Sequence, residues 1–260
     1  MTATDVIDGG IAAIKAAPSA VLLASAAFVV PCQLLVLAVI RDRPSGMGAA
    51  GIVRSLTDLF GSSSVDAVQV LAPLALHSFA LTLLAATIAQ LVAGWYYRQP
   101  VLAGTAIAAT LRRVPTLFAL WAAVHVSEAL AALVLVMPAL AVTTLCSVAV
   151  PVLVVEGCGP FAAMRRSSQL TRTRVGSVFG IVVLIALVDL VLATTLGGVS
   201  FLVTPFDFAP AVSGAVVSAA SIVTAPFVAA ATTLLYLDLR VRAEGLDIEL
   251  GIVERMHAAQ

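Results

Sequence analysis

The stretch EGCGPFAAMRRSSQLTRTR, residues 156–174, places four arginines beside several serine and threonine hydroxyls. Guanidinium groups and hydroxyls near the start of a helix are suitable donors for a phosphate. The same arginines could instead contact anionic lipid headgroups, with about 1 kcal/mol from each. The segment before them, residues 116–155, has only His125 and Glu128 as acidic, basic or histidine side chains. A phosphate group and a lipid bilayer are therefore both candidate binding partners.

A third interpretation connects this stretch with the end of the last apolar segment. Acids and bases occur at both places, and the residues concerned are Glu156, Arg165, Arg166, Asp238, Arg240, Arg242 and Glu244. If the last helix continues, Asp238 and Arg242 are neighbours on its surface, because residues four apart share a helix face. Arg240 and Glu244 have the same spacing. We therefore predict a charge network that docks the C-terminal tail beneath the helices.

Three further ionisable residues lie inside long apolar segments. His125 and Glu128 are three residues apart, which places them on one face of a helix, and Asp189 lies near the middle of another segment. An ionisable side chain is costly inside a membrane and often marks a functional site. These groups could line a path for protons or ions, or they could form polar contacts that join helices. Both interpretations stay open.

Motifs for known catalytic or metal chemistry are missing from the sequence. It contains no Gly-x-Ser-x-Gly, no His-Glu-x-x-His, no phosphate-binding glycine loop and no paired cysteine motif. Cys32, Cys146 and Cys158 lack the spacing of metal ligands. We therefore predict that the protein is not an enzyme and has no catalytic residues, no cofactor and no metal site.

The composition determines the class of protein. Of the 260 residues, 61% are hydrophobic and 11% are charged, whereas a soluble domain has about 25% charged residues. Only lipid could cover so much apolar surface. The sequence therefore predicts an all-α, polytopic membrane protein. The net charge of zero gives no indication of a nucleic-acid partner.

The apolar segments predict six transmembrane helices in one membrane domain, residues 1–260. The run 116–155 is about 60 Å long as one helix, twice the thickness of the hydrocarbon core, so it must cross twice. Met137-Pro138 is the predicted turn, because proline disfavours a helical residue before it. The expected spans are 19–40, 71–97, 116–137, 138–155, 178–199 and 211–237, followed by a tail, 238–260.

The basic residues indicate the orientation. With six spans, eleven of the fourteen lie on the side of both termini, and only Arg41, Arg43 and Arg54 lie on the other. The positive-inside rule then places both termini in the cytoplasm. The high ratio of arginine to lysine, with abundant alanine and valine, is typical of a GC-rich bacterial genome. The expected location is the bacterial inner membrane.

Three short stretches suggest an internal repeat. They read AAIK at 12–15, ATLR at 109–112 and AAMR at 162–165, each shortly before a span. A proline follows the first two basic residues at the third position, where it suits the start of a helix. The repeat predicts three units, each consisting of a short interfacial helix and a hairpin of two spans.

Two longer motifs resemble a known family. The first matches at Glu156, Gly157, Ala163, Arg166, Ser167, Leu170 and Thr171, and the second at Tyr236, Asp238, Leu239, Arg240, Arg242, Glu244, Gly245 and Asp247. The chain thereby resembles the bacterial membrane-domain family named after glycerophosphoryl diester phosphodiesterases. That name comes from fusions to a hydrolase domain, and this chain has no room for one. The resemblance implies a stand-alone membrane domain, for which the family has no agreed activity.

The sequence therefore predicts a helper or scaffold for a membrane complex or for an envelope or lipid process. Its expected contacts are anionic headgroups of the bilayer and a protein partner at the cytoplasmic face. The alternative is a small transporter of a lipid or polar solute that uses the buried ionisable residues. No inverted repeat supports this alternative, and Pro31 and Pro226 are the only obvious positions at which a helix could break.

Overall fold

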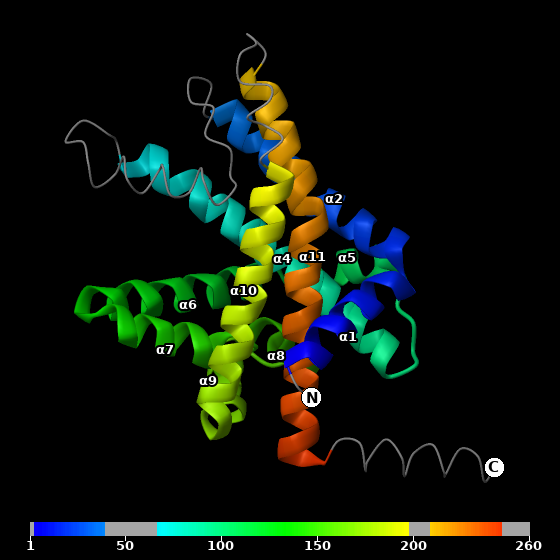
Figure 1. Ribbon diagram of the computed structural model, residues 1–260, viewed down its shortest axis with the longest axis vertical. Coiled ribbons are helices and arrows are strands. Elements are labelled where there is room, and N and C mark those ends of the chain that lie inside the picture. The colour runs from blue at the N-terminus through cyan, green and yellow to red at the C-terminus, as the bar shows by residue number, and fades with distance from the viewer. Residues whose placement is uncertain (1–2, 40–66, 198–208, 246–260) are drawn as a thin grey trace.

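The computed structural model describes residues 3–39, 67–197 and 209–245. All regular elements in these ranges are helices, and together they provide six apolar stretches that are long enough to cross a membrane (Figure 1). They are α1 (Ala3–Ala16), α2 (Pro18–Val39), α4 (Ala67–Tyr96), α5 (Ala103–Arg112), α6 (Val114–Val134), α7 (Val136–Cys146), α8 (Ala149–Glu156), α9 (Pro160–Thr171), the 3₁₀ turn η1 (Arg172–Arg174), α10 (Val175–Gly197) and α11 (Ala209–Glu244). The chain is an all-α, multi-pass membrane protein.

The helices follow one another in three similar units. A short amphipathic helix, α1, α5 or α9, precedes two apolar spans in each unit, and the second span of the middle unit consists of α7 and α8. In the three repeated stretches the second residue, Ala13, Thr110 or Ala163, is buried. The basic residue two positions later is exposed each time. The repeat in the sequence therefore corresponds to the same burial pattern in three helices.

The turn between α6 and α7 lies at Leu135 and not at the expected Met137-Pro138. Leu135 is extended, with φ −170° and ψ 160°, and α7 begins at the next residue. Pro138 is the third residue of α7, where the backbone has no N–H partner within the helix in any case. The proline therefore lies in the first turn of a helix, so the two spans are not 116–137 and 138–155.

The second of these spans is also broken. α7 ends at Cys146 and α8 begins at Ala149, with Val148 between them at φ −105° and ψ 13°. Pro151 explains the break, because its ring would clash with the carbonyl of Ser147 and it has no N–H to donate. The other prolines expected to break helices, Pro31 and Pro226, lie inside the continuous helices α2 and α11.

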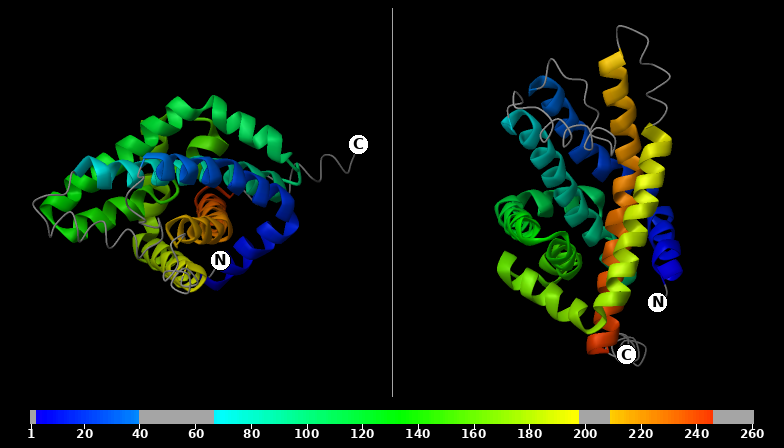
Figure 2. Two further views of the ribbon diagram at one scale, coloured as in Figure 1. Left: turned by 90° about the horizontal axis from the view of Figure 1, so that it is seen from above. Right: turned by 60° about the vertical axis from the view of Figure 1, so that its left-hand side comes forward.

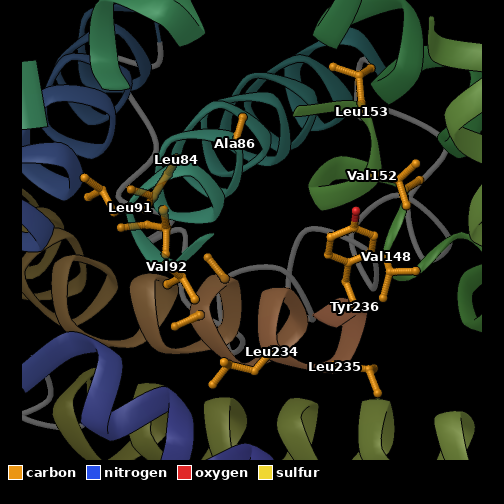
Figure 3. Packing of buried hydrophobic residues seen from close by; sticks show 14 of the residues in the cluster. Leu84, Ala86, Leu91, Val92, Val148, Val152, Leu153, Leu234, Leu235 and Tyr236 are labelled. Carbon is orange, nitrogen blue, oxygen red and sulfur yellow. The ribbon is translucent and has the colours of Figure 1, made fainter. Parts of the chain in front are cut away.

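α11 is the central helix of the molecule. It packs against α1, α2, α4 and α10, and Figure 2 shows it surrounded by other helices when the structure is seen from above. In its apolar segment 67% of the residues are buried, against 11% in α6. Figure 3 shows the core where α11 meets α4 and α8, with Tyr236 pointing from α11 toward Val148 and Val152.

The α6–α7 hairpin leaves the body of the molecule to one side, across the direction of α10 and α11 (Figure 1). Its base packs on α4 and α9. Aromatic contacts fix this base, since the ring of Phe79 on α4 lies 5.4 Å from that of Phe118 and 5.8 Å from that of Trp121. Further out the hairpin is exposed, so one of the three units is packed less closely than the others.

Candidate functional site: a charge ring at the base of α11

A tight turn between α8 and α9 positions the first acidic residue of the site. Glu156 is the last residue of α8, and Gly157 follows it with φ +67°, a left-handed conformation that glycine adopts without a steric penalty. Pro160 then occupies the first position of α9, where its fixed φ suits a helix start. This Glu-Gly-x-Gly-Pro sequence therefore reverses the chain and brings α9 beside the end of α8.

Four charged side chains form a closed ring at this place. Arg166 Nε lies 3.2 Å from a carboxylate oxygen of Glu156, and the guanidinium of Arg166 also pairs with Glu244. Arg240 Nε lies 3.0 Å from Glu244 and 3.8 Å from Glu156. Each charge therefore lies between two charges of opposite sign. We call Glu156, Arg166, Glu244 and Arg240 the charge ring.

Tyr236 connects the charge ring to the apolar core. Its ring is fully buried, and its hydroxyl donates to Glu156 Oε1 at 3.1 Å. The same hydroxyl accepts from Nη1 of Arg240 at 3.2 Å, one turn further along α11. Sequence reasoning noted Tyr236 only within the family-like motif and did not expect it in the network. The packing of its ring fixes the position of its polar end.

The charge ring is half-buried, with 20–30% of each charged side chain exposed. Two acids balance two bases, so the ring has no net charge. Charge-assisted hydrogen bonds of this kind are stronger than neutral ones, and partial burial protects them from screening by salt. The charge ring thus joins the end of α11 to both α8 and α9.

A further arginine links α6 to the same region. Arg113, the residue before α6, donates from Nη1 to the carbonyl oxygens of Leu153 and Val154 at 3.5 Å and 3.2 Å. Both carbonyls belong to the last turn of α8, where such groups lack a partner within the helix and attract positive charge. Sequence reasoning missed Arg113 because its acceptors are backbone atoms about forty residues away.

The other predicted network residues lie outside the charge ring. Asp238 and Arg242 form the expected pair on α11, with Nε 2.9 Å from Oδ2. Arg165 is exposed, and its guanidinium has no ion pair or hydrogen bond with the described residues. The predicted tail begins as a direct helical continuation of α11 to Glu244, and residues 246–260 lie outside the described residues.

The hydroxyls expected to bind phosphate have other partners. Ser167 is fully buried and donates to the carbonyl oxygen of Leu145 at 2.6 Å. Thr171 donates to the same carbonyl at 3.5 Å, and Ser168 donates to the backbone of Arg165. Leu145 is in the last turn of α7, directly before the break, where its carbonyl needs an external donor. Ser167 and Thr171 are therefore buried and engaged in joining α9 to α7, which contradicts the phosphate interpretation for these two hydroxyls, whereas the bond of Ser168 lies within α9.

The environment of the nearest cysteine, Cys158, favours its protonated form. The thiol of Cys158, in the turn between α8 and α9, lies 4.0 Å from the carbonyl oxygen of Val152. Burial raises the pKa of this thiol, and the neighbouring Glu156 carboxylate raises it further. Because the thiolate is the reactive form of cysteine, this shift disfavours Cys158 as a nucleophile.

The intramembrane ionisable residues form two separate groups. His125 Nδ1 lies 2.8 Å from Glu128 Oε2, and Thr143 on α7 donates to Glu128 Oε1 at 2.9 Å. This group therefore connects the two helices of the hairpin. Asp189 on α10 forms a side-chain hydrogen bond with Thr224 on α11. The structure thus assigns each acid its own interhelical contact.

Comparison with protein-family models, with curated proteins and with solved structures finds no match to this chain. The resemblance to the glycerophosphoryl diester phosphodiesterase membrane domain remains a prediction from the two motifs. The structure does give these motifs a shared physical role, since Glu156 and Arg166 from the first contact Arg240 and Glu244 from the second.

Proposed function

We propose that this protein is a non-catalytic helper or scaffold in the bacterial inner membrane, with both termini in the cytoplasm. The observation that supports this is the closed charge ring, whose acids and bases are already paired with one another. A catalytic or transport site keeps ionisable groups available for its substrate, whereas these groups hold helices together. The charge ring therefore acts as a structural element of a docking platform.

The cytoplasmic face of this platform carries exposed positive charge. Lys15, Arg112 and Arg165 are exposed at equivalent positions of the three units. Eleven of the fourteen basic residues belong to the same predicted side. Anionic headgroups attract such residues with about 1 kcal/mol each. We assign the exposed basic residues to lipid contact and the end of α11, with the tail after it, to contact with a protein partner.

Charge reversal in the ring tests this function. The Arg166→Glu variant places three acids around one arginine, and we expect lower protein levels and faster proteolysis of the C-terminal tail in membrane vesicles. The second reversal, Glu244→Arg, restores two acids and two bases and the ion pair between positions 166 and 244. It leaves like charges side by side at positions 156 and 166 and at positions 240 and 244, so it should recover both in part. Arg165→Glu is the matched control, because Arg165 is the exposed neighbour of Arg166 and has no partner among the described residues.

The partner contact has its own readout. Affinity purification of the full chain from native membranes should recover a partner with wild type, less of it with the double variant, and none with Arg166→Glu. Equal recovery of the partner with Arg166→Glu would contradict the docking role, and an unchanged tail accessibility would contradict the structural role of the charge ring.

A small transporter is the second candidate, and the break between α7 and α8 favours it. Discontinuous helices near polar groups are common at transport sites, and Asp189 is an acid within a predicted span. In proteoliposomes with an internal pH-sensitive dye, a proton pathway through Asp189 requires that Asp189→Asn abolish proton flux at normal protein levels. No flux in wild type, or equal flux in both, excludes this route.

A further inference from the structure

The outer half of the α6–α7 hairpin, residues 125–143, has no buried residue at all. Burial begins again at Thr144, and on the other side Trp121 still contacts α4, because its indole N–H donates to Ser78 at 3.0 Å. Large apolar side chains cover this outer half, including Leu130, which is 61% exposed, and Leu133, which is 82% exposed. We refer to residues 125–143 as the outer hairpin.

The outer hairpin also carries an incompletely satisfied polar group. The side chain of His125 is 46% exposed and that of Glu128 is 24% exposed, inside a helix that is otherwise apolar. An exposed ionisable pair is costly in hydrocarbon, and such groups in spans almost always face protein or a water-filled cavity. Lipid alone is therefore a poor cover for this surface.

The hydrogen bonds within the hairpin determine which donors and acceptors of His125 and Glu128 remain available to a partner. A carboxylate only accepts, so a hydrogen bond from His125 to an ionised Glu128 requires the proton on the nearer nitrogen, Nδ1. The other nitrogen, Nε2, has no partner among the described residues. It accepts a hydrogen bond when the imidazole is neutral and donates one when it is charged. Glu128 also keeps free lone pairs beyond those used by His125 and Thr143.

We propose that the outer hairpin is the interface with a second copy of this chain, in which two hairpins form a four-helix bundle. A two-fold axis along the membrane normal keeps both copies in the same orientation and brings identical surfaces together. The surface is self-complementary, because it contains both a base and an acid. His125 Nε2 of each copy can then meet Glu128 or Thr143 of the partner while the leucines pack between the helices.

This interface is independent of the proposed function, because it shares no residue with the charge ring. It also explains why the most exposed hairpin carries an ionisable pair. In the dimer the pair would be surrounded by protein, and each histidine would gain the partner that the single chain does not provide. The occupant is a second copy because no other partner needs to be assumed for both the acid and the base to be matched.

The oligomeric state of the purified full-length protein in lipid nanodiscs or liposomes tests the proposal. We expect a dimer, whose dissociation constant rises about 3- to 20-fold in His125→Leu, the range of interhelical hydrogen bonds in membranes. Leu130→Trp should also weaken the dimer by misfitting the bundle. Leu187→Trp on α10, which is 52% exposed, is the matched control and should leave the dimer intact.

Cross-linking provides a readout that does not depend on these variants. In a protein whose three native cysteines are replaced by alanine, a new cysteine at Leu133 should cross-link two copies in native membranes, and one at Leu187 should not. A monomer in liposomes at high protein density overturns the proposal. Equal cross-linking at both positions, or cross-linking of Leu133→Cys only to a different protein, overturns it as well.

Discussion

The charge ring and the outer hairpin use similar side chains in opposite ways. In the charge ring, two acids and two bases from three helices satisfy one another, and Tyr236 donates to an acid 80 residues away in the sequence. In the outer hairpin, one acid and one histidine are three residues apart on the same helix, and Thr143 is their one long-range hydrogen-bond partner among the residues that the structure describes. The first arrangement is closed, and the second leaves hydrogen-bonding capacity unused.

The difference shows how the position of a charge determines its role. Contacts between distant segments fix a fold, because each one removes freedom from two elements at once. Contacts between neighbours on one helix stabilise it by only a few tenths of a kcal/mol and leave its outer face open. We therefore expect substitutions in the charge ring to affect stability strongly, and those in the outer hairpin to affect it weakly.

The largest effect should follow the loss of Glu156. In Glu156→Ala, Arg166 and Tyr236 lose a hydrogen-bond acceptor and Arg240 loses an ion-pair partner. We expect the free energy of unfolding to fall by about 2–3 kcal/mol. Arg242→Gln is the control, since the exposed Arg242 pairs with a neighbour on its own helix, and such i, i+4 pairs contribute only about 0.3–0.5 kcal/mol. Unfolding of the purified protein in mixed micelles, followed by tryptophan fluorescence, measures both. If both substitutions lower the free energy of unfolding equally, the closed charge ring is no more stabilising than an ion pair within one helix.

The next largest loss of stability should follow the removal of the hydrogen bond between α9 and the end of α7. Ser167→Ala leaves the Leu145 carbonyl with only the longer bond from Thr171, and we expect a loss of about 1–2 kcal/mol. Ser168→Ala removes a hydroxyl that bonds within its own helix, so its effect should stay within about 0.5 kcal/mol. The same unfolding assay compares them. A negligible effect of Ser167→Ala would mean that α9 does not hold the base of the hairpin.

A substitution in the left-handed turn before α9 should cause a smaller loss of stability. A side chain at position 157 is strained at φ +67°, so Gly157→Ala should cost about 1 kcal/mol by displacing Glu156 from Arg166. Gly176→Ala lies in a helix with open space around it and should stabilise the protein by about 0.5 kcal/mol. Thermal denaturation of the two variants, measured by circular dichroism, should shift in opposite directions.

The smallest effect is expected in the outer hairpin. Thr143→Val keeps the shape of the side chain but removes the bond to Glu128, and we expect a loss of about 0.6 kcal/mol. Thr194→Val on α10 is a matched control, because that hydroxyl bonds only to its own helix. If Thr143→Val costs as much as Glu156→Ala, the outer hairpin is held as firmly as the charge ring.

Part of the candidate site could be predicted from the residues alone. The spacing of Arg240 and Glu244 on a continuing helix predicted their ion pair, and this prediction is confirmed. The burial of Tyr236 and the backbone acceptors of Arg113 could not be predicted, because they depend on which helices lie side by side. The break at Ser147-Val148 was missed, although Pro151 is the residue that explains it.

The sequence by itself determined the class of protein, the number of apolar helices and the three-unit pattern, since these follow from local hydrophobicity, length and helix-start residues. The tertiary structure alone decided which polar side chains have hydrogen-bond and ion-pair partners and which keep free donors or acceptors. The reason is that a membrane helix can pack in several ways with the same apolar surface. Only the packing of α11 against α4 and α8 brings Tyr236 and Arg240 to Glu156, while α6 and α7 lean away with His125 exposed.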